Sequence, residues 1–183
     1  MILLFSINYR NRIMKFDSFQ AITAAFKDAE VRYLVAGGLA VNAHGYMRMT
    51  IDVDLVIQLQ FDNIIPAFRA LATLGYQPRV PITADQFADA KQREGWIREK
   101  GMTVLNFYSD QHPLTSVDIF VTEPFNFDTE YDNALIGELA PGLFVRFVSI
   151  PTLIKMKETA NRPRDLDDIQ HLEMILEEKK QNE

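Results

Sequence analysis

The sequence predicts an α/β (α+β) fold, in which a mixed β-sheet is flanked by helices and followed by C-terminal helices. Period-2 stretches rich in β-branched residues alternate with stretches of helical period along the first 150 residues. Two further helical stretches, "PTLIKMKETA" and "PRDLDDIQHLEMILEEKK", end the chain. This order is typical of helices packed against a sheet around one core.

The first elements are a helix and a strand. Apolar residues recur at helical spacing from Asp17 to Glu30, with Asp17 or Ser18 as the expected N-cap. The β-branched run "VRYLVAG" then predicts a strand that glycine stops. "GLAVNAHGY" predicts a short helix ending at Gly45.

The middle of the chain continues the alternation. "IDVDLVIQL" is a strand by its period of two, and "FDNIIPAFRALATLGY" is a helix with Pro66 in its first turn and Gly75 as its stop. "TADQFADAKQREGWIREK" is a polar, exposed helix or lid-like segment. "MTVLNFYS" and "TSVDIFVT" are strands joined through the turn "DQHP".

The C-terminal part of the chain is expected to hold two strands and two helices. The strands lie on either side of the Pro-Gly turn in "NALIGELAPGLFVRFVS". The helices have Pro151 and Pro163 near their first positions, and the charged tail after Leu176 is expected to fray.

The 183 residues favour one domain with an accessory part. We expect an N-terminal extension or edge strand at 1–16, a core at 17–150, and a C-terminal helical segment at 151–183 packed on that core. "MKFDSFQ" reads like a natural beginning, so translation starts either at Met1 or at Met14.

Composition narrows the function classes. The net charge of −6 argues against a surface that coats nucleic acid without specificity, although it leaves room for a local basic patch. The chain has no cysteine, so a metal would need oxygen or histidine ligands. No apolar run approaches the roughly 18 residues of a membrane span. We expect a cytoplasmic protein without a membrane partner.

The acid pair Asp52 and Asp54 stands in an apolar strand. Because strand side chains alternate, both point to one face, roughly 7 Å apart. Two such carboxylates repel each other and are costly to desolvate, which a divalent cation would offset. Oxygen ligands indicate Mg²⁺ or Mn²⁺. The alternative is a solvated strand end with two surface acids.

Two further features accompany this pair. Gly37-Gly38 ends a strand and opens a helix, where free backbone N–H groups form an anion site; alone, such a pair would be a turn. Asp118 is a single acid in another β-branched strand. If that strand lies beside the Asp52/Asp54 strand, three carboxylates converge on one metal site.

Together, Gly-Gly, a short helix, Asp-Val-Asp and a later strand Asp resemble the nucleotidyltransferase superfamily pattern. "VAGGLAVNAHGYMRMTIDVDLVI" and "LIKMKETANRPRDLDDIQHL" are similar to small bacterial members, namely the AbiEii-type toxins and the lincosamide and aminoglycoside nucleotidyltransferases. The resemblance covers residues from about Phe19 to Leu176. It implies transfer of a nucleoside monophosphate from a nucleoside triphosphate to an acceptor hydroxyl, with release of pyrophosphate.

The resemblance also implies roles for residues. Asp52 and Asp54 match metal ligands, and Asp118 matches a third ligand or general base. The acceptor would be an RNA, such as a tRNA end with an antitoxin protein as partner, or a small molecule such as an antibiotic. Many members carry Ser after the first Gly, where this chain has Gly38. That departure keeps open a non-catalytic nucleotide- or partner-binding member.

Four more residues are candidates for nucleotide binding. Arg48 either neutralises triphosphate charge or steadies Asp54, and Thr50 hydrogen-bonds a phosphate. Lys157 and Arg162 belong to a local basic cluster, and the resemblance implies that Lys157 reaches the β- and γ-phosphates. The alternatives are a surface Arg48 with an ordinary acid partner and helix C-terminal cations that complement the helix dipole. Asp165, Asp167 and Asp168 are interpreted as structural.

Overall fold

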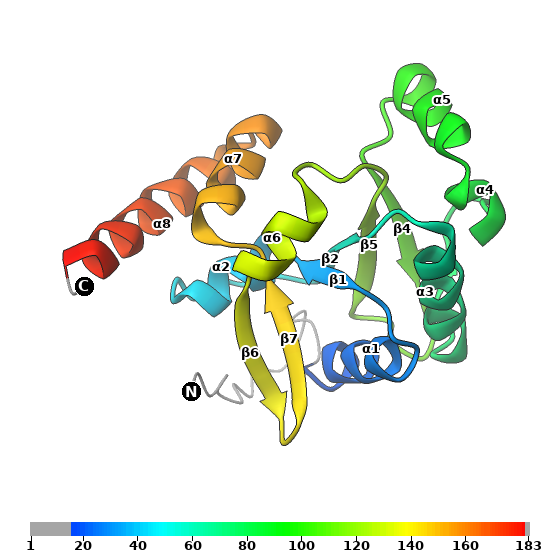
Figure 1. Cartoon of the computed structure of the whole chain (residues 1–183), viewed down its shortest axis with the longest axis horizontal. Helices are drawn as coiled ribbons and strands as arrows, with labels where there is room; N and C mark the ends of the chain where they lie inside the picture. The colour runs from blue at the N-terminus through cyan, green and yellow to red at the C-terminus, as the bar shows by residue number, and fades with distance from the viewer. Residues whose placement is uncertain (1–15, 182–183) are drawn as a thin grey trace.

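The computed structural model describes residues 16–181 and shows a seven-stranded sheet in the order β3-β4-β5-β2-β1-β7-β6 (Figure 1). Strands β2 and β5 run parallel, as do β1 and β7, and the other neighbours run antiparallel. The predicted mixed sheet is therefore confirmed. The strands are β1 (Tyr33–Val35), β2 (Asp52–Ile57), β3 (Gln77–Pro78), β4 (Val104–Tyr108), β5 (Ser116–Phe120), β6 (Leu135–Ala140) and β7 (Leu143–Phe147).

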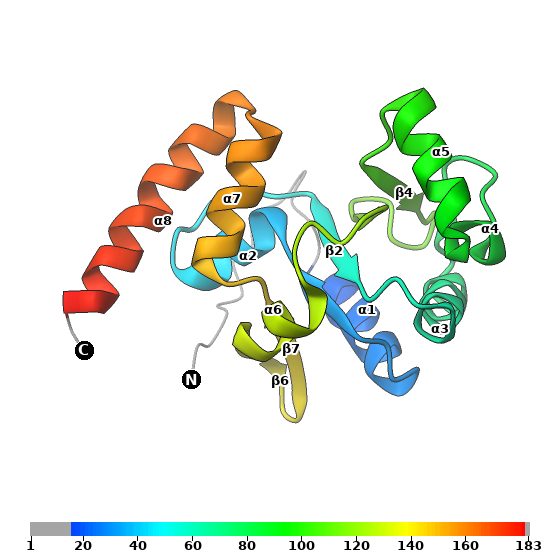
Figure 2. The same ribbon diagram turned by 45° about the horizontal axis from the view of Figure 1, so that its top comes forward.

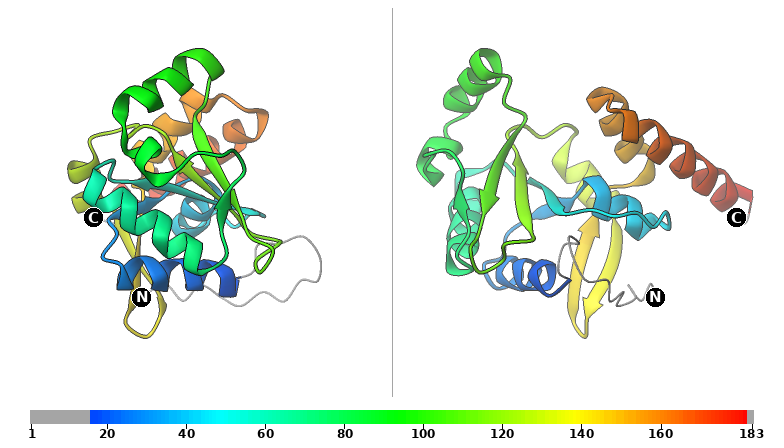
Figure 3. Two further views of the ribbon diagram at one scale, coloured as in Figure 1. Left: turned by 90° about the vertical axis from the view of Figure 1, so that its right-hand side faces the viewer. Right: turned by 180° about the vertical axis from the view of Figure 1, so that it is seen from behind.

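Helices flank this sheet, as predicted, and two of them end the described chain. α7 and α8 lie at one end of the molecule and α4 and α5 at the other (Figures 1 and 2), as the view from behind also shows (Figure 3). The helices are α1 (Phe16–Asp28), α2 (Gly37–His44), α3 (Phe61–Thr73), α4 (Ala84–Ala88), α5 (Ala90–Lys100), α6 (Phe127–Asn133), α7 (Ile150–Ala160) and α8 (Pro163–Gln181).

Two sequence predictions concern parts of the chain that the structure does not describe. The expected edge strand at the N-terminus and the start at Met14 fall in residues 1–15, outside the described residues. Within residues 16–181, no helix combines the length and apolar character needed to cross a membrane.

The two faces of strands β4, β5 and β2 differ sharply. Side chains such as Val53, Phe107 and Val117 are at most 1% exposed and join a core that includes Phe26 of α1 and Leu71 of α3. The intervening residues point the other way and, apart from the buried Val56, are only partly buried. We call this second side the open face, and it carries the polar residues of the three strands.

Several helix boundaries differ from the predictions. α1 begins at Phe16, so Asp17 and Ser18 lie in its first turn and neither is the N-cap; the Ser18 hydroxyl instead contacts His112 Nδ1 at 2.9 Å. Pro66 is the sixth residue of α3 and not in its first turn. It is tolerated there at the cost of one helical hydrogen bond.

The segment "TADQFADAKQREGWIREK" forms two helices instead of one. Asp89 has an extended backbone (ψ 111°), which ends α4, and its carboxylate accepts hydrogen bonds from Lys91 N at 2.8 Å and Gln92 N at 3.4 Å. Asp89 is thus both the end of one helix and the N-cap of the next. The apolar pattern alone predicts one continuous helix here, and the cap at Asp89 divides it into two.

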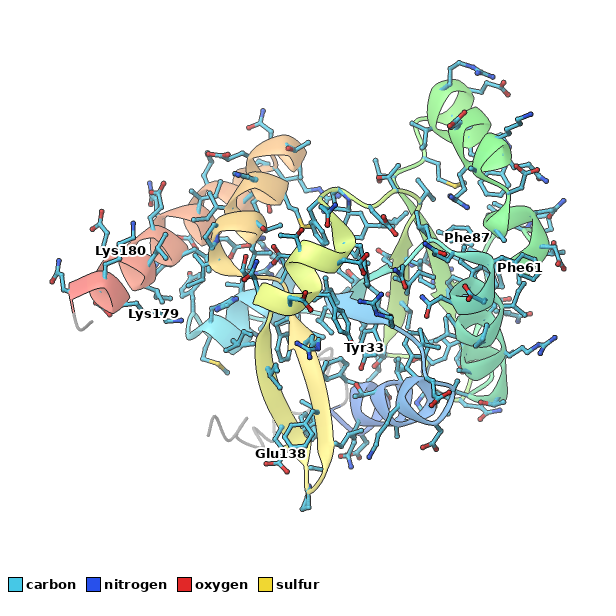
Figure 4. All side chains as sticks on the ribbon, in the orientation of Figure 1. Tyr33, Phe61, Phe87, Glu138, Lys179 and Lys180 are labelled. Atoms are coloured by element: carbon cyan, nitrogen blue, oxygen red, sulfur yellow. The ribbon has the colours of Figure 1, made fainter. Side chains whose placement is uncertain are left out.

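Two elements have no counterpart in the sequence predictions, and one lasts longer than predicted. Strand β3 has only two residues, and helix α6 is capped by Asn126, whose side chain accepts from Thr129 N at 2.9 Å. Helix α8 continues to Gln181, so the expected fraying after Leu176 does not occur. The side chains of Lys179 and Lys180 extend from its final turn (Figure 4), where cations complement the helix dipole.

Candidate active site

Strands β2 and β5 bring the three predicted acids onto the open face. In this parallel pair Asp54 lies opposite Asp118, and Asp52 lies opposite Ser116. Neighbouring strands are about 4.8 Å apart. The strand with Asp118 therefore lies directly beside the strand with the acid pair, which the sequence could state only as a condition.

Each carboxylate has a different neighbour. The Ser116 hydroxyl donates a hydrogen bond to Asp52 Oδ1, and Asn106 Nδ2 donates to Asp118 Oδ1 at 2.5 Å. Asp54 lies against the backbone of Gly37. Within residues 16–181, no three His, Cys, Asp or Glu side chains are gathered closely enough to enclose a metal ion. The acids thus share a face, and two of them accept hydrogen bonds from neighbouring side chains.

The electrostatics of the acids are unfavourable without a countercharge. Burial, followed by the charges of Asp118 and Asp52, raises the pKa of Asp54 to about 6, while Lys157 and Arg162 partly oppose the shift. Burial also raises the pKa of Asp118, and the hydrogen bond from Asn106 works against this. Buried like charges of this kind are relieved by a bound cation.

Gly37 connects β1 directly to α2. Its φ of +58° lies in the left-handed region, and a Cβ at this position would fall 1.8 Å from Asp54 Oδ2. The preceding residue, Ala36, has no side chain that can cap the helix, so the N–H groups of the first turn receive no side-chain hydrogen bond there. Uncapped N–H groups at a helix N-terminus favour anions.

Thr50 and Arg48 lie over the first turn of α2. A Cβ on Gly38 would come within 2.7 Å of Thr50 Oγ1 and 3.0 Å of Arg48 Nη2. The structure therefore places Thr50 beside the predicted anion site, together with one end of Arg48. A serine at position 38 has no room while Thr50 keeps this conformation.

Lys157 and Arg48 share a buried acid. Lys157 Nζ lies 2.6 Å from Asp168 Oδ2 and 3.2 Å from Asp165 Oδ1. Arg48 Nε lies 2.8 Å from Asp168 Oδ1, at ion-pair distance, although neither atom has a hydrogen bond of good geometry. Asp168 is fully buried. This ion-pair network, made of Arg48, Lys157, Asp165 and Asp168, joins α7 and α8 to the segment before β2.

Arg162 differs from these two cations. It lies in the turn between α7 and α8 and is exposed, and within residues 16–181 no carboxylate lies at ion-pair distance from its guanidinium. Its charge lowers the pKa of both Asp54 and Asp118. Arg162 is thus a cation without an ion-pair partner among residues 16–181, and its charge acts on the acids.

Sequence reasoning missed the residues at the other side of the open face. Asn106 Nδ2 donates a hydrogen bond to Asp118. Arg79, the residue directly after β3, contacts Asn106 Oδ1 through its Nε. Its guanidinium lies over the Tyr108 ring, 5.2 Å from the ring centroid. The period of two in "VLNFY" was a usable signal, because it places Asn106 and Tyr108 on the same face of their strand.

Comparison with solved structures supports this description of the fold. The solution structure of the antibiotic-resistance factor ANT(2'')-Ia has a TM-score of 0.57 at 13% identity and covers 88% of this chain and 83% of that one. The lincomycin-bound lincosamide antibiotic adenylyltransferase LnuA has a TM-score of 0.56 at 14% identity, covering 90% and 99%.

A nucleotidyltransferase-like protein from Paracoccidioides brasiliensis, described as antigenic, has a TM-score of 0.51 at 14% identity, over 86% of this chain and 74% of that one. No protein-family model and no curated protein sequence matches the chain. Identities this low establish the fold alone. The chain has a nucleotidyltransferase-like fold, similar to that of antibiotic adenylyltransferases.

Proposed function

We propose that the chain is a nucleotidyltransferase that uses Mg²⁺ or Mn²⁺ to move a nucleoside monophosphate from a nucleoside triphosphate to an acceptor hydroxyl. The observation that carries the proposal is the position of Asp54. It lies opposite Asp118 across β2 and β5 and against Gly37 at the uncapped start of α2. Carboxylates and an anion site thus adjoin, which is the arrangement a metal-bound triphosphate requires.

The acids fit a hard divalent cation. Asp52, Asp54 and Asp118 offer only oxygen donors on one face, and burial, followed by repulsion between these acids, raises the pKa values of Asp54 and Asp118. These three residues would hold the ion. When bound, it would neutralise triphosphate charge and lower the pKa of a coordinated hydroxyl.

Other groups of the chain bind the triphosphate and accept the proton of the acceptor hydroxyl. Backbone N–H groups of Gly37 and Gly38 and the Thr50 hydroxyl bind phosphate oxygens, and Arg162 offsets phosphate charge. The acceptor oxygen forms a bond to the α-phosphorus as the bond from that phosphorus to the leaving pyrophosphate breaks. Asp118 accepts the hydroxyl proton.

Lys157 and Arg48 have positioning roles in this proposal. Direct contact between Lys157 and a phosphate would require breaking its 2.6 Å ion pair with Asp168. By holding Asp168, the two cations instead fasten α8, and with it the turn that carries Arg162, to the segment before β2. The ion-pair network thereby sets the distance between Arg162 and the acids.

The acceptor is either a small molecule or an RNA. Similarity to the fold of antibiotic adenylyltransferases favours a small molecule such as an antibiotic. A tRNA end, with an antitoxin protein as partner, remains the second acceptor, although the net charge of −6 counts against it. A non-catalytic nucleotide-binding protein is the alternative function, favoured because no three His, Cys, Asp or Glu side chains within residues 16–181 are grouped so as to hold a metal ion.

The test measures binding and transfer separately. Wild type and the variant D52N/D54N are incubated with Mg²⁺ and each α-labelled nucleoside triphosphate, together with tRNA, lincomycin or kanamycin. We expect labelled acceptor and pyrophosphate from wild type alone. D132N is the matched control, because Asp132 is exposed on α6, and it should behave as wild type.

Thermal unfolding separates the two functions. Mg²⁺ with a nucleoside triphosphate at 100 times its Kd should stabilise either kind of protein by about 2.7 kcal/mol. Stabilisation without release of pyrophosphate from the nucleoside triphosphate, whichever acceptor or cell lysate is added, supports the non-catalytic alternative. Equal transfer by wild type and D52N/D54N would overturn the enzyme proposal.

A further inference from the structure

The open face continues beyond the acids as two rows of polar side chains. In the first row, Arg79 N donates to Asn106 O at 2.9 Å, Asn106 lies opposite Asp118, and Asp118 lies opposite Asp54. Three strand spacings of about 4.8 Å therefore separate the two ends of this row. The side of the face away from Gly37 ends at Arg79.

A second row runs beside the first. Gln77 on β3 lies opposite Tyr108 on β4, and its Nε2 donates to the Tyr108 hydroxyl at 2.8 Å. On the neighbouring strands, Ser116 lies opposite Asp52. Tyr108 thus stands between Gln77 and the strand that carries Asp118. Its ring forms the surface over which the Arg79 guanidinium lies, 5.2 Å from the ring centroid.

Arg79 is held in place without being neutralised. Its Nε donates to Asn106 Oδ1 and its guanidinium stacks on Tyr108, yet the side chain is exposed. Within residues 16–181, no carboxylate lies at ion-pair distance from it. A guanidinium fixed through Nε and one face keeps its terminal N–H groups for another partner, and this fork matches the oxygens of phosphate or carboxylate groups.

The orientation of the Asn106 amide, which joins Arg79 to Asp118, is determined by its two partners. Arginine has no acceptor, so Asn106 must turn Oδ1 toward Arg79 and Nδ2 toward Asp118, and the 2.5 Å contact with Asp118 agrees with this. Arg79 and the third acid are thus adjacent partners of one amide. A group bound by Arg79 lies beside the acid that faces the acceptor hydroxyl in our proposed function.

The two unneutralised arginines lie on different flanks of the acids. The charge of Arg162 acts on Asp54 and Asp118, whereas Arg79 acts on Asp118. In the proposed function, the anion site at Gly37 and the Arg162 side chain bind the triphosphate. Arg79 is therefore available to bind the acceptor. An acceptor rich in amines would meet an uncompensated like charge there.

We propose that Arg79, held by Asn106 and Tyr108, binds an oxyanion of the acceptor, so that the acceptor is a hydroxyl compound bearing a phosphate or a carboxylate and not a polycation. That the bound compound is the acceptor of a transfer reaction rests on the proposed function. The binding site itself is defined by the open face.

The first test follows binding directly. The Arg79 Nε–H resonance in ¹⁵N-labelled full-length protein is assigned by its loss in R79M and followed during titration. The probes are ribose 5-phosphate, gluconate, a short RNA with a free 3′ hydroxyl, and kanamycin. We expect saturable shifts with oxyanions and none with kanamycin, and the responding probes identify phosphate ester, carboxylate or RNA as the source.

Variants then test the contribution to affinity. R79M should weaken binding of the responding probe at least tenfold, and R79K, which keeps charge without the fork, should fall between. The control R69M removes an exposed arginine of α3 and should bind as wild type. Unchanged melting temperatures show that each variant is folded.

The outcomes separate this inference from the proposed function. Saturable oxyanion binding at Arg79 without nucleotidyl transfer to any compound supports the binding site and counts against the enzyme. Transfer to kanamycin that R79M leaves unchanged supports the enzyme and overturns the inference. A resonance that no oxyanion shifts also overturns it.

Discussion

Gly37 is the residue at which backbone conformation and the acid site meet most directly. G37A adds a Cβ 1.8 Å from Asp54 Oδ2 to a backbone with φ +58°. We expect it to lower the free energy of unfolding by about 2 kcal/mol or more and to displace Asp54. Urea denaturation measures the first effect, and Mg²⁺-dependent binding of a nucleoside triphosphate measures the second.

Gly95 provides the matched control for this change. It lies within α5, and a Cβ there would meet no atom within 4 Å. Because alanine favours the helix over glycine, G95A should raise the free energy of unfolding by about 1 kcal/mol. Equal effects of the two substitutions would refute the requirement for glycine at Gly37.

Asp54 makes stability depend on pH. Its folded pKa of about 6 exceeds the ordinary value of 3.8, so between these values the folded protein holds a proton that the unfolded chain has released. Stability therefore falls as pH rises through this window, by at most about 3 kcal/mol for two pKa units. Urea denaturation of metal-free protein at pH 3.5 and 7.5 should show this loss.

D54N removes the ionisable group and should remove this loss with it. The variant is expected to be more stable than wild type at pH 7.5 and similar at pH 3.5, with EDTA present throughout. D132N should retain the wild-type pH dependence. If the difference between D54N and wild type is the same at both pH values, burial of a charged Asp54 is not the cause.

At the scale of elements, the ion-pair network fastens α7 and α8 to the segment before β2. K157M leaves Asp165 and Asp168 buried without their shared cation and should cost about 3–5 kcal/mol. K155M removes an exposed lysine from the same helix and should change stability by less than about 0.5 kcal/mol. Chemical denaturation compares the three proteins.

A double-mutant cycle isolates the pair within this network. Because the two side chains are in contact, K157M/D168N should be less destabilised than the sum of K157M and D168N, with a coupling of about 0.5–3 kcal/mol. Additive effects would show that Lys157 is stabilised by packing alone. The network would then not account for the position of α8.

The elements also show where sequence reasoning succeeds. The period of two in residues 51–59 predicts both the strand and the common face of Asp52 and Asp54, because side-chain alternation is a local property of the backbone. Capping by Asp89 is a local effect as well. Because Asp89 both ends α4 and caps α5, it divides the helical segment while the spacing of the apolar residues stays unchanged. Boundaries therefore follow from capping more than from periodicity.

At the scale of the whole molecule, the packing of strands and helices determines which side chains become neighbours, and sequence patterns alone do not show this. Asp118 becomes a neighbour of Asp54 only because β5 pairs with β2, and Arg48 approaches Asp168 only because α8 packs beside the segment before β2. Arg79 depends on a two-residue strand, which has too few residues for any periodic signal. The contacts of Asp54 with Asp118 and of Arg48 with Asp168 join distant parts of the chain, and composition and spacing do not encode them locally.

The placement of α4 and α5 has a consequence for how this protein can diverge. Neither helix contributes to the acids, to the start of α2 or to the ion-pair network, and the two lie at the opposite end of the molecule from α7 and α8 (Figure 2). Apart from the buried Phe87 and Arg93, the side chains of these two helices are exposed or only partly buried, so substitutions at the remaining positions leave the acids and the ion-pair network in place. These positions can therefore vary during evolution, while Gly37 and Asp168 tolerate almost no exchange.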